Sequence, residues 1–67
     1  MMNVLVNNKE QTIKDGTELD VLLEKLSISS QGVAVALNQH VVKKTDWAST
    51  LLKEGDKITI IKATQGG

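Results

Sequence analysis

The last two residues, Gly66 and Gly67, are the part of this sequence best suited to chemistry. A terminal carboxylate can be activated by a nucleotide only if its chain threads a narrow channel, and glycine offers the thinnest and most permissive backbone for this. Adenylation would convert the Gly67 carboxylate into a mixed anhydride, which a sulfur nucleophile supplied by a partner can attack to leave a thiocarboxylate. The pattern predicts covalent modification at Gly67, with two accidental glycines as the alternative.

The other reactive side chains form no recognised catalytic or metal-binding pattern. The sequence has no cysteine, which excludes a disulfide, a thiolate nucleophile and a zinc knuckle. The single histidine, His40, falls in a predicted turn without a second ligand, so we expect a solvated residue. Four acidic residues lie in a turn and at a predicted helix start: Asp15, Glu18, Asp20 and Glu24. Negative charge there stabilises the helix dipole, so we expect these side chains to cap the helix and face solvent and not to bind a metal. We expect no self-contained enzyme and no metal site.

Composition excludes several further classes. A chain of 67 residues with 40% hydrophobic residues and zero net charge is typical of one soluble globular domain. All eight basic residues are lysine and the only aromatic residue is Trp47, so nucleic acid is not an expected partner and Trp47 is expected to fill the core. No apolar run approaches the roughly 20 residues that span a bilayer. We expect a cytoplasmic protein with no membrane partner.

Hydrophobic periodicity predicts two hairpins with one helix between them, followed by a last strand. The first half should contain an N-terminal hairpin over residues 2–13, a turn at Asp15-Gly16, and a helix with Thr17 as its N-cap. The apolar stripe of that helix consists of Leu19, Leu22, Leu23 and Leu26. The second half should contain a strand at 33–37, a turn at 38–40, a strand at 41–42, a helical turn from Thr45 with Leu51 and Leu52 packed inward, a turn at 54–56 and a strand at 57–63.

These elements predict an α+β fold of the ubiquitin-like β-grasp type. Its mixed sheet should have about four to five strands, with the first and last strands adjacent at the centre and one main helix packed on one face. Residues 1–63 would form this domain. The tail consists of Thr64, Gln65, Gly66 and Gly67. Because it leaves a central strand with no turn signal, we expect it to project freely and to enter a channel in a partner.

Three stretches of the sequence allow comparison with a known family. They are V-A-V-A-L-N-Q-H-V-V-K-K-T-D-W from Val33 to Trp47, L-L-K-E-G-D-K-I-T-I-I from Leu51 to Ile61, and the final Gly66-Gly67. Together they resemble the thiamin-biosynthesis sulfur carrier family, ThiS, over essentially the whole chain. Lys44 replaces the family's frequent Arg, and Gln65 is bulkier than expected before the glycines, but neither difference touches the terminal carboxylate.

The resemblance implies that an adenylating enzyme related to ubiquitin activators uses ATP to activate Gly67, after which a sulfur-donor system supplies sulfur drawn from cysteine. The resulting thiocarboxylate would donate its sulfur to thiazole synthase. On this interpretation the chain itself binds no cofactor. Docking is expected on the sheet face that the helix leaves uncovered, where alternation exposes Ile61 or its neighbours Ile58 and Ile60.

Three other functions stay open at the level of sequence. The small subunit of molybdopterin synthase shares the fold, the Gly-Gly end and the thiocarboxylate, but usually is longer and carries an aromatic-Pro-Pro stretch, whereas this chain has no Pro and no Phe. A ubiquitin-like modifier would join Gly67 to lysines of other proteins. A non-covalent interaction module would be unaffected by deletion of Gly66 and Gly67.

Overall fold

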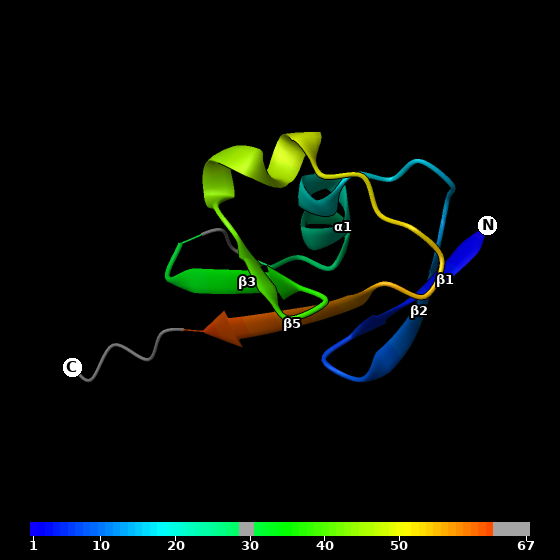
Figure 1. Cartoon of the computed structure of the whole chain (residues 1–67), viewed down its shortest axis with the longest axis horizontal. Helices are drawn as coiled ribbons and strands as arrows, with labels where there is room; N and C mark the ends of the chain where they lie inside the picture. The colour runs from blue at the N-terminus through cyan, green and yellow to red at the C-terminus, as the bar shows by residue number, and fades with distance from the viewer. Residues whose placement is uncertain (29–30, 63–67) are drawn as a thin grey trace.

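The computed structural model describes residues 1–28 and 31–62, and Figure 1 shows their arrangement. The elements are β1 (Met2–Val6), β2 (Lys9–Ile13), α1 (Leu19–Lys25), β3 (Val33–Leu37), β4 (His40–Val42), the 3-10 helix η1 (Lys44–Ser49) and β5 (Lys57–Lys62). The predicted two hairpins, the helix between them and the last strand are therefore confirmed, and η1 lies between the second hairpin and that strand. None of the helices in the described part of the chain is both long and apolar enough to cross a membrane.

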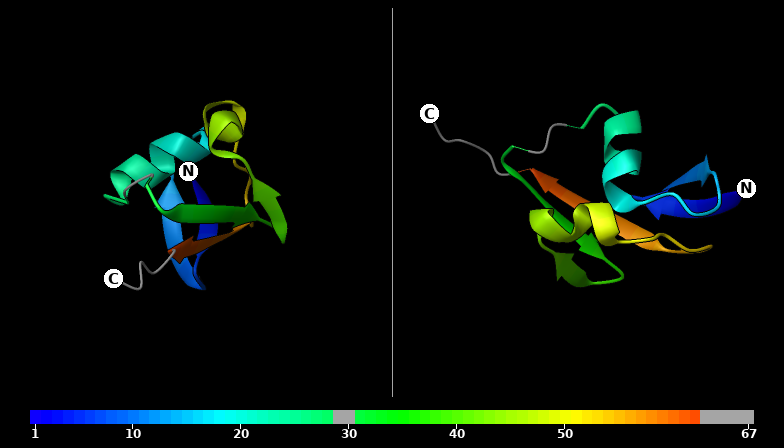
Figure 2. Two further views of the ribbon diagram at one scale, coloured as in Figure 1. Left: turned by 90° about the vertical axis from the view of Figure 1, so that its left-hand side faces the viewer. Right: turned by 90° about the horizontal axis from the view of Figure 1, so that it is seen from above.

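The last strand lies at the centre of the sheet. The described strands form one five-stranded sheet in the order β2-β1-β5-β3-β4. Strand β5 is parallel to β1 and antiparallel to β3, and the outer strands belong to two antiparallel hairpins. Helix α1 and η1 lie on the same face of this sheet, as the turned views in Figure 2 show. This is the predicted β-grasp arrangement, in which a hairpin on each side encloses β5.

The core forms between the covered face of the sheet and the leucines of α1. Strand β1 alternates strictly between buried and exposed residues, as its sequence predicts. The side chains of Leu19, Leu22 and Ile58 are completely buried in this core. Burying each such side chain contributes about 1.5–3 kcal/mol. The remaining buried hydrophobic residues are Met2, Val4, Val6, Ile13, Leu23, Val35, Trp47 and Leu52.

The start of α1 differs from the prediction. Thr17 is not the N-cap: its hydroxyl donates to the Lys14 carbonyl oxygen at 2.6 Å, and the cap position belongs to Glu18, whose side chain makes no capping hydrogen bond. The helix is instead held by a neighbouring segment, because the Leu19 N–H donates to the Thr50 carbonyl oxygen at 2.8 Å. A tertiary contact therefore replaces the local cap that the sequence suggested.

The segment after η1 also differs in part. Leu52 is buried as predicted, but Leu51 is 59% exposed. Glu18 and Leu51 form an isolated antiparallel bridge, and the Leu52 N–H donates to the Thr17 carbonyl oxygen at 3.0 Å. Extended backbone of this kind sends successive side chains to opposite sides. Only one of the two leucines can therefore face the core.

The second hairpin has a tighter turn than the one predicted. Asn38 and Gln39 both adopt left-handed φ angles, 50° and 74°, so two residues suffice to reverse the chain. His40 consequently begins β4, where it pairs with Leu37, instead of lying in the turn. Its side chain is exposed, in agreement with the solvated position that the sequence indicated.

Candidate functional site

The predicted site of modification lies outside the described residues. Gly67 and the other tail residues, Thr64, Gln65 and Gly66, belong to the segment 63–67, which the structure does not describe. The boundary between domain and tail that we placed at residues 63 and 64 likewise stays a prediction. The structure does describe β5, the strand that leads to this segment.

A polar network holds the start of β5. The Asp56 carboxylate accepts hydrogen bonds from the Lys53 backbone N–H at 2.7 Å and from the Asn38 side-chain amide at 3.0 Å. Asn38 also accepts the Lys57 backbone N–H at 2.9 Å through its side-chain oxygen. Since Asp56 is only 9% exposed, these bonds satisfy a carboxylate that has lost most of its contact with water. The network ties the β3–β4 turn to the first residue of β5.

The three isoleucines of β5 do not share one environment. Ile58 is completely buried and Ile60 is half-buried against the core, so both face α1. Ile58, one of the three predicted docking candidates, is therefore not available for docking, and Ile60 points to the same covered side. Ile61 lies on the opposite face and is 57% exposed. The two-residue period of a strand explains this division, and the sequence alone could not decide which parity faces the helix.

Ile61 belongs to an apolar surface on the uncovered face of the sheet. Ile61 is paired with Ala34 of β3, and Val41 of β4, 77% exposed, is paired with Ala36. Leu5 of β1 lies on the same face and is 36% exposed. We call this surface the outer-face patch: Leu5, Ala34, Ala36, Val41 and Ile61. It crosses the strands on both sides of β5.

Trp47 has the structural role that the sequence predicted. It is 5% exposed, and its indole N–H donates to the Val42 carbonyl oxygen at 2.9 Å. This bond satisfies the one polar group of the side chain while the ring packs into the core. Trp47 therefore fixes η1 against the end of β4.

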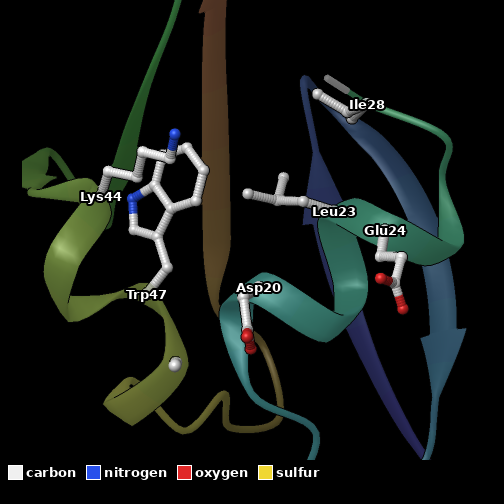
Figure 3. A pocket seen from close by; sticks show the side chains of 7 residues that line it. Asp20, Leu23, Glu24, Ile28, Lys44 and Trp47 are labelled. Atoms are coloured by element: carbon white, nitrogen blue, oxygen red, sulfur yellow. The ribbon is translucent and has the colours of Figure 1, made fainter. Parts of the chain in front are cut away.

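A hollow of about 370 Å³ lies between α1 and η1. In Figure 3, Leu23 extends from α1 toward Trp47 of η1, and Asp20 and Lys44 also line the hollow. The Oδ1 atom of Asp20 is buried and has no hydrogen-bond partner among the described residues. The lining holds no serine, cysteine or histidine, and no group of acidic or histidine residues within 1–28 and 31–62 is arranged to hold a metal ion.

Sequence reasoning missed the polar side chains that position β5. The sequence predicts only a turn at Asn7, yet its side-chain oxygen accepts the Ile60 backbone N–H at 2.8 Å. It likewise predicts only turns at Asp56 and Asn38. A turn pattern identifies local backbone geometry, whereas these side chains bond to residues 18 and 53 positions away. No signal in a single sequence reports such long-range pairs.

The sequence of this chain is similar to those of known proteins. A model of the ThiS family matches residues 4–67. The sulfur carrier protein ThiS of Escherichia coli K12 is 32% identical over 66 residues, which cover 98% of this chain and the whole of that protein. A thiazole synthase of Paramagnetospirillum magneticum is 30% identical over 66 residues, which cover 98% of this chain but only 20% of that protein.

Solved structures agree with these sequence relationships. The crystal structure of the thiamine biosynthesis protein ThiS from Geobacter metallireducens matches with a TM-score of 0.84 and 29% identity, covering 98% of this chain and 100% of that one. The solution structure from the same organism matches with a TM-score of 0.77 and 29% identity, covering 98% and 88%. The family model matches nearly the whole chain, and both the Escherichia coli protein and the crystal structure are matched over their full length. The chain therefore belongs to the ThiS family of sulfur carriers.

Proposed function

We propose that this chain carries sulfur for the thiazole ring of thiamin on the carboxylate of Gly67. The observation that carries the proposal is the family match, which extends through the two terminal glycines. The fold is compatible with it, because the tail follows directly from β5, a strand held on both sides by neighbouring strands. The folded domain then binds the partner enzymes and presents the tail, and the chemistry takes place at the end of the tail.

The reaction requires two steps at one carbon atom. The Gly67 carboxylate attacks the α-phosphate of ATP, which releases pyrophosphate and leaves an acyl adenylate. A sulfur nucleophile then attacks the carbonyl carbon, and AMP leaves with the electron pair of the broken C–O bond. If the nucleophile is hydrosulfide, loss of AMP leaves the thiocarboxylate directly. If it is the outer sulfur of a cysteine persulfide, a second thiol attacks the S–S bond of the acyl disulfide, forms a disulfide with the donor cysteine and releases the thiocarboxylate. ATP is bound by the adenylating enzyme, so the chain needs no cofactor and no catalytic residue of its own.

Two enzymes and one sulfur source are the proposed partners, all in the cytoplasm. The adenylating enzyme activates Gly67, a sulfur-donor system supplies the sulfur, and thiazole synthase accepts it. Support for the last partner comes from the Paramagnetospirillum protein named thiazole synthase, one fifth of which is similar to nearly all of this chain. We assign docking of these enzymes to the outer-face patch, to which β5 contributes Ile61.

Intact mass spectrometry tests the carrier chemistry directly. The chain is incubated with ATP, a sulfur donor and the adenylating enzyme of the same genome, beside a control chain that lacks Gly67. We expect the complete chain to gain the mass difference between one sulfur and one oxygen, and the control to stay unchanged. A folded chain that gains no mass while the enzyme is active on another carrier would contradict the proposal. Appearance of Gly67 joined to lysines would indicate a protein modifier instead.

A further inference from the structure

We propose that the open edge of β5 beyond Asn7 pairs with an extended segment of the partner that accepts the sulfur, thiazole synthase; this inference rests on the function proposed above. Strand β1 ends at Val6, since Asn7 and Asn8 adopt left-handed φ angles of 51° and 69° and turn the chain into β2. The β1–β5 pairing reaches only Ile58, whereas β3 stays paired with β5 as far as Lys62. Figure 1 shows β5 running past the tip of the first hairpin.

The register identifies the backbone groups at this open edge. In an antiparallel pair, residues turn their N–H and C=O groups alternately toward and away from the neighbouring strand. The Asn38 N–H donates to the Lys57 carbonyl oxygen at 2.8 Å, so the backbone N–H and C=O groups of odd-numbered residues of β5 point toward β3. The backbone groups of even-numbered residues point toward the opposite edge, and the bond of 2.9 Å from the Asn7 N–H to the Ile58 carbonyl oxygen confirms this.

The side chain of Asn7 extends the hydrogen bonding between β1 and β5 by one further residue of β5. Its oxygen accepts the Ile60 N–H at 2.8 Å, while its amide reaches the Ile60 carbonyl oxygen at a long 3.4 Å. The next groups along the edge are the N–H and C=O of Lys62, and no described residue pairs with them on this side. Unpaired strand edges are ready templates for another extended chain.

A hollow beside this edge indicates which side chains the added strand would carry. It measures about 490 Å³, and Val6, Ile28 and Ile60 supply its apolar lining. Lys9 and Lys62 also line it, both exposed and neither in an ion pair with any residue of the described ranges. Because alternate side chains of an added strand point to one face, the fitting segment presents an apolar side chain to the hollow and an acidic side chain two positions away to the lysines on the same face.

The position of the edge suits an enzyme that must receive the end of the tail. Lys62 is the last residue of β5, and residues 63–67 follow it to the reactive carboxylate. A backbone pairing at Lys62 would hold the strand at the point from which the tail departs. It adds to docking through the outer-face patch, since the edge and the face of a sheet are separate surfaces.

Amide hydrogen exchange on the complex tests the pairing. The isotopically labelled chain is bound to thiazole synthase of the same genome, and exchange of the Lys62 amide is compared with that of the free chain. We expect exchange at Lys62 to slow at least tenfold in the complex. An unchanged rate in a formed complex would overturn the pairing and leave the carrier function standing, whereas failure to form any complex would overturn both the pairing and the proposed partner.

A pair of variants separates the backbone donor from the side-chain charge. Lys62→Pro removes the N–H that faces the open edge but no bond to β3, and Lys62→Gln removes only the charge. We expect Lys62→Pro to bind thiazole synthase about tenfold more weakly than Lys62→Gln, as the loss of one desolvated hydrogen bond predicts. Equal affinities would contradict the proposal.

The free chain provides the remaining control. Protection of the Lys62 amide that disappears when residues 64–67 are deleted would make the chain's own tail the occupant. Protection that rises with protein concentration would make a second copy the occupant. Either result would overturn the assignment to thiazole synthase.

Discussion

The Asp56 carboxylate joins segments that are far apart in the sequence. It accepts from the Lys53 backbone and from the side chain of Asn38, whose own oxygen accepts from Lys57. Its burial raises the cost of leaving any of these groups without a partner. One side chain therefore connects the β3–β4 turn, the turn before β5 and the first residue of β5.

Replacement of Asp56 by Ala should lower the free energy of unfolding by about 1–3 kcal/mol, because it leaves the Lys53 N–H and the Asn38 amide without their acceptor. Urea denaturation measures this change. Asp15→Ala is the matched control: Asp15 is 78% exposed and lies 3.5 Å from the N-terminal amino group, so its loss should change stability by less than about 1 kcal/mol. Equal effects of the two substitutions would show that the network contributes little.

At the scale of elements, successive side chains of β5 point alternately to the core and to the uncovered face of the sheet. Ile58 and Ile60 face α1, and Ile61 lies in the outer-face patch between β3 and β1. A change at Ile61 therefore tests binding without opening the core. The same change at Ile58 would test only folding.

Ile61→Asp should weaken binding to the adenylating enzyme and to thiazole synthase by about tenfold or more, since the contact loses an apolar side chain worth roughly 1.5–3 kcal/mol when buried. Titration calorimetry with each enzyme measures the affinities. Val21→Asp, at a 45% exposed position of α1, is the control and should bind normally. If Ile61→Asp stays folded and binds both enzymes as before, docking through the outer-face patch is refuted.

The elements were predictable to different degrees. The strands were found because strict alternation and apolar runs reflect burial directly, and the place of β5 beside β1 followed from chain topology. The N-cap at Thr17 and the inward position of Leu51 were wrong, because each depends on a contact with a distant segment. The sequence left open which of the three isoleucines of β5 is exposed, since both parities of the strand carry isoleucine. The modified residue Gly67 was proposed from sequence and resemblance, and the described residues leave it a prediction.

At the scale of the whole molecule, a 67-residue chain has little stability to lose. Typical domains are stable by about 0.05–0.15 kcal/mol per residue, which corresponds to roughly 3–10 kcal/mol here. The core is correspondingly small and depends on a few completely buried side chains, Leu22 among them. A single substitution that leaves a large cavity can therefore remove much of the free energy of unfolding.

Leu22→Ala should lower the free energy of unfolding by about 2–5 kcal/mol, a large part of the total, and should lower the midpoint of thermal unfolding accordingly. Thermal unfolding followed by circular dichroism measures the effect. Val21→Ala is the neighbouring control on the same helix, and its partly exposed side chain should cost far less. A midpoint that falls no further for Leu22→Ala than for Val21→Ala would contradict this view of the core.

The central position of the last strand has a consequence for synthesis of the protein on the ribosome. Until residues 57–62 have emerged, the hairpin of β1 and β2 has no strand to join it to the hairpin of β3 and β4. Such non-local pairings form late, since their loops must close first. A nascent chain interrupted before Lys57 should therefore stay open to proteases. Proteolysis would then remove unfinished chains, and the chains that survive would be those synthesised at least through β5.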